Sequence, residues 1–179
     1  MSRPETRRRL YGAAVELIAE QGFTATTVDA IAERAGVAKG TVFYNFGSKE
    51  GLFAAVLEHG IERLSDAMAA AAEDGLDAVV MAQLRFFDEF GPFARVLVAE
   101  VWQTAWQDAV VRLREGAIGV YERVLKESDL PRDFDAGTAA TALFGMVLTV
   151  SIERRALHPE RPLEQTHATL TDLIRLRIH

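Results

Sequence analysis

Residues 27–51 read TVDAIAERAGVAKGTVFYNFGSKEG, and they carry the clearest structural signal in the chain. Apolar residues in the first part recur at the i, i+3, i+4, i+7 spacing of one helix face: Val28, Ile31, Ala32 and Ala35. This spacing predicts a short helix that begins at Thr26–Thr27 and ends at Gly36. A second short helix is predicted from residue 39 to residue 46.

A tight turn at Gly36-Val37-Ala38 separates the two predicted helices. Gly36 can supply the positive φ that such a turn commonly needs, and Val37 is expected to face the small core. Two short helices joined in this way form a helix-turn-helix, which places its second helix in the major groove of DNA. Similar helix pairs also occur in ordinary helical bundles, so the spacing alone leaves both interpretations open.

Further helices are predicted on both sides of this unit. A first helix is predicted to end at Gly22, and a long fourth helix follows Ser48, whose hydroxyl is suited to the N-cap. Beyond Gly75, breaks at glycine and proline leave helical segments near 76–90, 93–106, 108–128, 135–157 and 163–177. Strand-like alternation persists nowhere along the sequence, so the predicted fold class is all-α.

Three spaced segments of this region, TTVDAIA (26–32), AGVAKGTVFYNF (35–46) and SKEGL (48–52), resemble the TetR family of bacterial transcriptional regulators. The resemblance covers residues 7 to about 60. It implies an N-terminal three-helix DNA-binding domain, here 1–47, and a helical effector-binding and dimerisation domain, here 48–179. Residues 48–73 would form the connecting helix between them.

The resemblance also implies roles for individual residues. Thr27 and Lys49 are expected to contact phosphates, and Tyr44 is expected to pack against the sugar-phosphate backbone. Lys39, Gly40 and Thr41 would lie nearest the base edges. Asn45, where histidine is common in the family, completes the expected DNA-binding set. Ala38 and Gly51 depart from the family pattern, because they remove a recognition-helix N-cap and a capping-box glutamate.

The charge distribution is compatible with DNA binding at one end of the molecule. The net charge is −6, but residues 1–50 hold seven basic and six acidic residues, so the acidic excess lies in the remainder. Arg7, Arg8 and Arg9 are either a phosphate-gripping arm or a solvated first turn. Phosphate contact is favoured, because cations oppose the dipole at a helix N-terminus.

Several other classes of function are not expected. Cysteine is absent, and the four histidines (His59, His158, His167 and His179) show no metal-ligand spacing. Catalytic sets and phosphate-binding loops are not evident, so we expect neither an enzyme nor a cofactor or metal. The uncharged stretch 136–152 falls short of a membrane span of about 20 apolar residues. A cytoplasmic protein without a membrane partner is therefore predicted.

The second half is expected to bind an effector and to dimerise. Four aromatic residues are candidates for lining a pocket for a small apolar or aromatic effector: Phe86, Phe90, Trp102 and Trp106. Binding of this effector would release the protein, acting as a repressor, from an inverted-repeat operator. Core packing is the alternative for most of them. Glu100 either orients a cationic ligand or, as favoured, is solvated. The small residues in 135–157 predict a homodimer interface that this helix forms together with the last helix. The alternative function is a dimeric regulator without an effector, controlled by a partner protein or acting as an activator.

Overall fold

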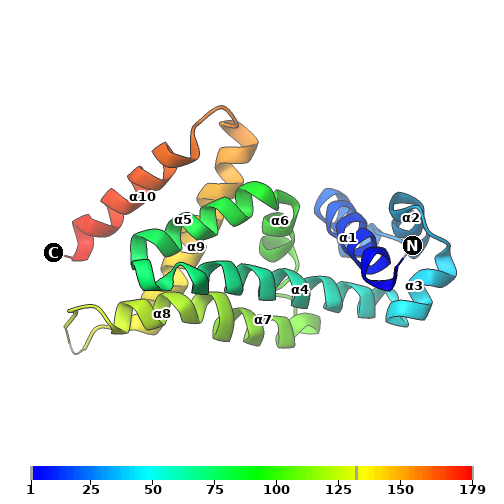
Figure 1. The fold of residues 1–179 in the computed structure, drawn as a ribbon, viewed down its shortest axis with the longest axis horizontal. Coiled ribbons are helices and arrows are strands. Elements are labelled where there is room, and N and C mark those ends of the chain that lie inside the picture. Colours follow the sequence, from blue (N-terminus) through cyan, green and yellow to red (C-terminus); the bar gives the residue numbers. More distant parts are fainter. Residues whose placement is uncertain (1, 132, 179) are drawn as a thin grey trace.

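The computed structural model describes residues 2–131 and 133–178, and for residues 176–178 only the backbone. Over these residues the chain forms helices and no strands (Figure 1), which confirms the all-α prediction. The elements are α1 (Arg3–Ala25), α2 (Val28–Ala35), α3 (Lys39–Phe46), α4 (Lys49–Ala70), η1 (Ala72–Asp74), α5 (Leu76–Glu89), α6 (Gly91–Ala99), η2 (Thr104–Trp106), α7 (Gln107–Leu113), the π-helical turn η3 (Arg114–Ile118), α8 (Gly119–Lys126), α9 (Ala136–Leu157) and α10 (Leu163–Ile178).

Helices α1–α3 form one end of the molecule, which we call the head, and α4–α10 form the body (Figure 1). The predicted bounds of α2 and α3 are confirmed, and local chemistry explains them. The Thr27 hydroxyl accepts a hydrogen bond from the Ala30 amide, and Gly36 adopts φ 62°, ψ 43° after α2. Ala38 forms no side-chain cap on α3, as its apolar side chain predicts.

Helix α4 connects the head to the body. Ser48 caps it by accepting from the Gly51 amide at 2.9 Å. A Cβ at residue 51 would lie 2.2 Å from the Phe46 carbonyl oxygen, so the close turn between α3 and α4 requires glycine there. The apolar face of α4 is buried along its whole length. It packs on α1 and α3 in the head and on α5, α7, η3 and α8 in the body.

The break predicted at Gly22 is present, since Gly22 adopts φ 81° and ψ 162°, and a short further turn carries α1 on to Ala25. The predicted end of the sixth helix is wrong, and a tertiary contact accompanies the difference. Helix α6 ends at Ala99 instead of continuing to residue 106. Glu100 follows α6, and its carboxylate bonds to the backbone of the head beside Gly22. This contact joins segments 77 residues apart, which sequence periodicity does not report.

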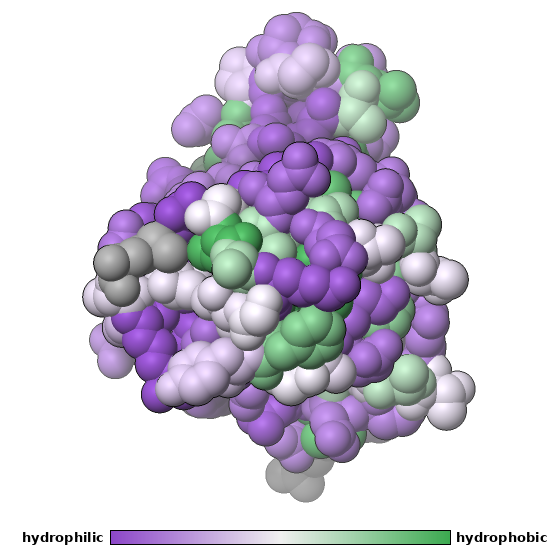
Figure 2. Space-filling model, turned by 90° about the vertical axis from the view of Figure 1, so that its right-hand side faces the viewer, coloured by the Kyte–Doolittle hydropathy of each residue, from purple (hydrophilic) through white to green (hydrophobic). Residues whose placement is uncertain are grey.

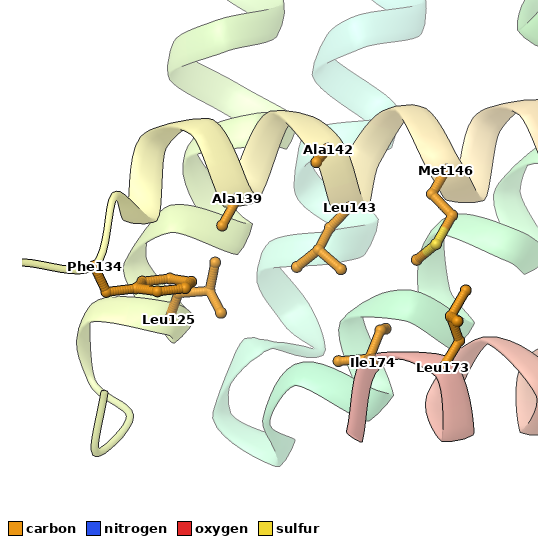
Figure 3. Close-up of a pocket in the computed structure, with 8 residues that line it drawn as sticks. All are labelled: Leu125, Phe134, Ala139, Ala142, Leu143, Met146, Leu173 and Ile174. Atoms are coloured by element: carbon orange, nitrogen blue, oxygen red, sulfur yellow. The ribbon is translucent and has the colours of Figure 1, made fainter. Parts of the chain in front are cut away.

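Helix α9 buries only one of its faces within the chain. Phe144 and Val147 lie in the core, whereas Ala142 and Thr149 are exposed and Gly145 is half-buried. By length and composition α9 could cross a membrane, but it packs along α5, α6 and α8 in the body. Only 33% of its apolar window is buried. Beside it lies an apolar hollow of about 470 Å³, drawn in Figure 3. Its lining comes from α8, α9, α10 and the α8–α9 loop: Leu125, Phe134, Ala139, Ala142, Leu143, Met146, Leu173 and Ile174.

Candidate nucleic-acid interface and interdomain cleft

Helix α3 presents one face to the core and the other to solvent. Val42 is fully buried, while Tyr44 is 79% exposed and Phe43 is 44% exposed. Lys39 and Gly40 are also exposed, and Thr41 is half-buried. Figure 2 looks at the head end of the molecule, where hydrophilic residues surround a few apolar ones. This face is free to enter a groove, because no other described element covers Tyr44.

The polar side chains of this face have weak or local partners. Lys39 Nζ lies 2.8 Å from the Asp29 carboxylate, and both side chains are more than half exposed. Such an exposed ion pair contributes little free energy, so a phosphate can displace Asp29 at small cost. Asn45 donates from Nδ2 to the Thr41 carbonyl at 2.8 Å. Thr27 uses its hydroxyl as the N-cap of α2 and remains exposed.

Lys49, the first residue of α4, joins the body to the head in a way that the sequence did not suggest. Its Nζ donates to the carbonyl oxygens of Phe23 and Thr26, each at 3.0 Å, and lies 4.2 Å from the centre of the Phe23 ring. The ammonium therefore fastens the end of α1 to the start of α4. An ammonium carries three donors, so one remains for a phosphate.

The N-terminal arginines separate into different environments. Arg7 donates to the Tyr11 hydroxyl at 2.7 Å and lies over the Phe46 ring, while Arg8 faces a cleft on the other side of α1. Arg3, which was not singled out from the sequence, lies 5.9 Å from the centre of the Tyr44 ring. Arg3 is therefore the arginine beside the exposed face of α3. Only folding brings residues this far apart together, so no spacing in the sequence indicates the pair.

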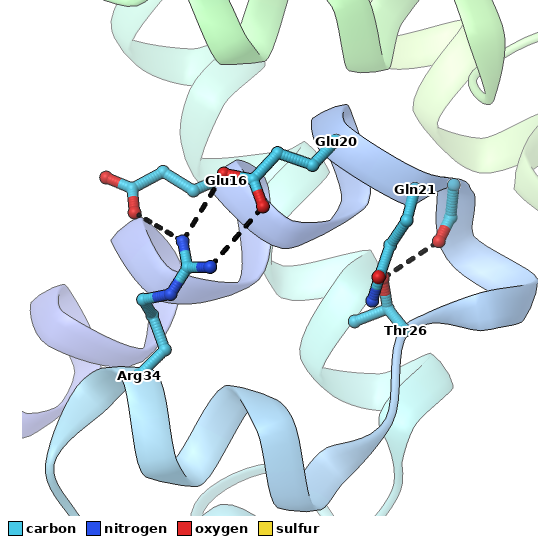
Figure 4. A network of polar contacts seen from close by, with 6 residues as sticks. Glu16, Glu20, Gln21, Thr26 and Arg34 are labelled. Carbon is cyan, nitrogen blue, oxygen red and sulfur yellow. Dashed lines mark hydrogen bonds and ion pairs between the residues drawn. The ribbon is translucent and has the colours of Figure 1, made fainter.

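A charged network joins the solvent-exposed sides of α1 and α2 (Figure 4). Arg34 of α2 forms ion pairs with Glu16 and Glu20 of α1, both at 3.3 Å. The hydrogen bond and charge of Glu20, followed by those of Glu16, raise the pKa of Arg34. Gln21 donates to the Thr26 hydroxyl where the chain leaves α1. These exposed ion pairs add little free energy. Helix α2 is held on α1 mainly by a shared buried core that includes Leu10, Ala14 and Ile31.

A cleft of about 350 Å³ lies between head and body, bounded by α1, α4, α5 and the start of α6. Its floor is apolar and includes Val56, Phe86 and Phe90. Arg8 and Arg63 stand at its rim, with Arg63 4.2 Å from the centre of the Phe90 ring. Neither guanidinium forms an ion pair within residues 2–131 and 133–178. Glu16 and Glu89 also line the cleft, so it combines an apolar surface with charges of both signs.

The structure does not bring the four predicted effector residues together. Phe86 and Phe90 line the cleft. Trp102 is 57% exposed in the link between α6 and α7, whereas Trp106 is buried against Phe23 and Phe53. The predicted single face through both tryptophans is wrong, because α6 ends at Ala99.

The polar groups in the core of the body are already bonded to one another and are not available to a ligand. The Tyr121 hydroxyl donates to Gln83 Oε1 at 2.7 Å, and Gln83 Nε2 donates to the Phe144 carbonyl at 3.0 Å. Burial raises the pKa of Tyr121, which keeps the phenol protonated as a donor. Because each of these polar atoms has a partner, the interdomain cleft is the better candidate for binding a small molecule.

The chain matches known proteins over both its sequence and its fold. The family model "Bacterial regulatory proteins, tetR family" matches residues 10–56. The HTH-type transcriptional regulator BetI 2 of Chromohalobacter salexigens is 30% identical over 174 residues, covering 88% of this chain and 80% of that protein. The HTH-type transcriptional activator FasR of Mycolicibacterium smegmatis is 28% identical over 94% of this chain and 80% of its own length. The structure of a putative fatty acid metabolism regulator of Clostridium perfringens superposes with a TM-score of 0.81 and 27% identity, covering 91% of this chain and 94% of that one.

Proposed function

The chain belongs to the TetR family of bacterial regulatory proteins and is a DNA-binding transcriptional regulator, and from this premise we propose that it acts as a dimeric repressor on an inverted-repeat operator. The observation that carries the proposal is the uncovered outer face of α3, with Tyr44 as its most exposed side chain. Residues 1–47 would serve as the DNA-binding domain and residues 48–179 as the effector-binding and dimerisation domain.

Direct contacts to the operator are proposed for residues of the head and for Lys49 at the start of α4. Lys39, Gly40 and Thr41 would lie at base edges, and Thr27, Tyr44, Asn45 and Lys49 would contact or pack against the backbone. Selecting bound duplexes from a random pool would define the operator. Thr41→Ala should then relax specificity at one position per half-site, whereas Tyr44→Ala should weaken binding to all duplexes similarly. Wild-type affinity in both variants would refute the role of this face.

The dimer is proposed to form through α9 and α10. The exposed side of α9 is rich in small residues, and the adjoining hollow is apolar. A second copy would cover this surface around a twofold axis, which places the same patch of both chains in contact. Such a dimer would place its recognition helices one turn of DNA apart, ~34–36 Å, or a multiple of that distance.

An effector is proposed to bind in the interdomain cleft. Its apolar floor suits an apolar molecule. Arg8 and Arg63, which form no ion pair within the described residues, would hold a carboxylate of that molecule away from Glu16 and Glu89 of the same cleft. The relative from Clostridium perfringens, named as a putative fatty acid metabolism regulator, makes a fatty acid the first probe to test. Because the cleft lies between α1 and the body, a ligand that fits it better in one head position shifts the equilibrium toward that position.

The effector is tested with a medium-chain fatty acid in a DNA-release assay. Arg63→Gln should weaken release without altering operator affinity, and Glu58→Gln, at an exposed position of the same helix outside the cleft, is the control. Release that is unchanged in Arg63→Gln would exclude this site.

Other modes of regulation remain alternatives to this proposal. One relative is named an activator, so activation is the second candidate, and control by a partner protein would apply if the cleft binds nothing. A reporter gene behind the selected operator distinguishes repression from activation. The named relatives are transcriptional regulators, and we propose no catalytic role. We place the regulator in the cytoplasm, where its operator would lie.

A further inference from the structure

The break in α1 at Gly22 leaves a backbone donor that needs a partner. Gly22 adopts φ 81°, a conformation that interrupts the helical hydrogen bonds of the last turn. The Phe23 amide that follows donates instead to Glu100 Oε1 at 3.0 Å. Glu100 belongs to the body, directly after α6. A carboxylate from the body thus satisfies an amide of the head.

Glu100 lies in an environment that a carboxylate does not favour. The residue is 7% exposed, and burying an ionised carboxylate costs free energy unless hydrogen bonds compensate. It also follows the C-terminus of α6, where the helix dipole repels negative charge. Gln103 Nε2 donates to its other oxygen at 2.5 Å. Local structure thus supplies one partner, Gln103, and the head supplies the other, the Phe23 amide.

The residues around this bond make the junction sensitive to head position. The Phe23 ring packs edge-on against Trp106 at 5.2 Å, and Trp106 packs edge-on against Phe53 of α4 at 4.7 Å. Lys49 holds the Phe23 carbonyl, while Glu100 holds the Phe23 amide. Trp106 Nε1 is buried without a hydrogen-bond partner in the described residues. Phe23 is therefore held by both its polar backbone atoms and its ring.

We infer that Glu100 is a positioning residue that sets the angle of the head on the body, and through it the operator half-site spacing that the regulator accepts. Helices α1, α2 and α3 share one buried core, so holding α1 at Phe23 also holds the recognition helix α3. In a twofold dimer, the head angle determines the separation of the two recognition helices. This inference rests on the proposed dimeric DNA binding for its operator readout only.

A matched pair of variants isolates the hydrogen bond. Glu100→Gln and Glu100→Met both remove the charge and keep the length of the side chain, but only glutamine retains an oxygen that accepts from the Phe23 amide. Glu127→Gln, an exposed carboxylate after α8, controls for the loss of one charge. Gln103→Ala removes only the second donor to Glu100 and should behave as wild type. Glu100→Leu, which also lacks an acceptor, replaces the methionine variant if that variant does not fold.

The operator experiment compares the selected inverted repeat with versions lengthened or shortened by one base pair between the half-sites. Wild type, Glu127→Gln and Glu100→Gln should each lose about tenfold in affinity on the altered spacings. Glu100→Met should lose about threefold or less, because its head is no longer held at one angle. A uniform loss on every spacing, or unchanged discrimination, would show that Glu100 does not position the head.

A second readout needs no DNA. The chain has two tryptophans, so Trp102→Phe leaves Trp106 as the sole reporter beside Phe23. In that background, Glu100→Met should shift Trp106 emission to longer wavelength, and Glu100→Gln should not. Identical spectra would overturn the inference. If wild type bound no inverted repeat, the proposed dimeric operator binding would fail by itself, and the fluorescence result would still decide the role of Glu100.

Discussion

A substitution at Gly145 tests the proposed dimer surface, because it should stabilise the folded monomer and weaken the dimer. A Cβ built at residue 145 meets no atom of the chain within 4 Å, although the residue is half-buried in the middle of α9. Replacing Gly145 with leucine therefore adds a side chain in open space. Removing a helical glycine should stabilise the monomer by about 0.5–1 kcal/mol.

The same side chain should obstruct a second copy that packs on α9. Overpacking a close contact costs typically 1–3 kcal/mol. The substitution occurs in both chains of a twofold dimer, so about 2–6 kcal/mol is expected. The lower value already corresponds to a roughly 30-fold weaker dimer. Operator affinity should fall with dimerisation, because a single head contacts only one half-site.

Sedimentation at micromolar concentration measures the assembly, and circular dichroism checks that helix content is retained. Gly12→Leu is the matched control for sedimentation, because Gly12 also lies in a helix with nothing within 4 Å of its built Cβ, but on α1. Gly12 lines the cleft between head and body, so this control is compared in oligomeric state alone. The control should remain dimeric. A Gly145→Leu protein that stays dimeric with unchanged operator affinity would refute the α9 interface. A Gly145→Leu protein that does not fold would show that residue 145 does not face open space in the monomer.

Three further predictions concern single contacts. Lys49→Ala should destabilise the head by about 1–3 kcal/mol, through loss of the bonds to the Phe23 and Thr26 carbonyls, and lower the salt slope of DNA binding by about 1; an unchanged slope would limit Lys49 to an internal role. Tyr121→Phe should cost about 1–3 kcal/mol in denaturant unfolding, because Gln83 Oε1 loses its donor, while operator affinity stays the same. Hydrogen bonds from Lys126 and then Arg114 lower the pKa of Glu122, so its stabilisation is fully present above the ordinary glutamate pKa and is lost as the pH falls through the lowered pKa. Melting temperatures of wild type and Glu122→Gln should therefore differ at neutral pH and converge once acid protonates Glu122; a difference that persists in strong acid would contradict this assignment.

The sequence predicted the head well because its signals are local. The apolar spacing of residues 28–35, the glycine at 36 and the N-cap at Ser48 each act within one or two helical turns. Their physical causes are backbone conformation, capping and burial of one helix face, and these can be evaluated from neighbouring residues. The all-α class and the bounds of α2, α3, α5 and α9 followed from the same local rules.

The sites between elements were not predictable in this way. Phe86 and Phe90 were expected beside Trp102 and Trp106, but the break after Ala99 places the tryptophans elsewhere. That break accompanies the bond between Glu100 and Phe23, and the placement of Arg3 beside Tyr44 likewise depends on the packing of α1. By itself, the sequence determined the helices, the helix-turn-helix and the family, because short-range backbone preferences and residue identities are written along the chain. Only the tertiary structure decided the cleft, the uncovered face of α9 and the role of Glu100, because each depends on where distant segments meet and which polar groups they leave for one another.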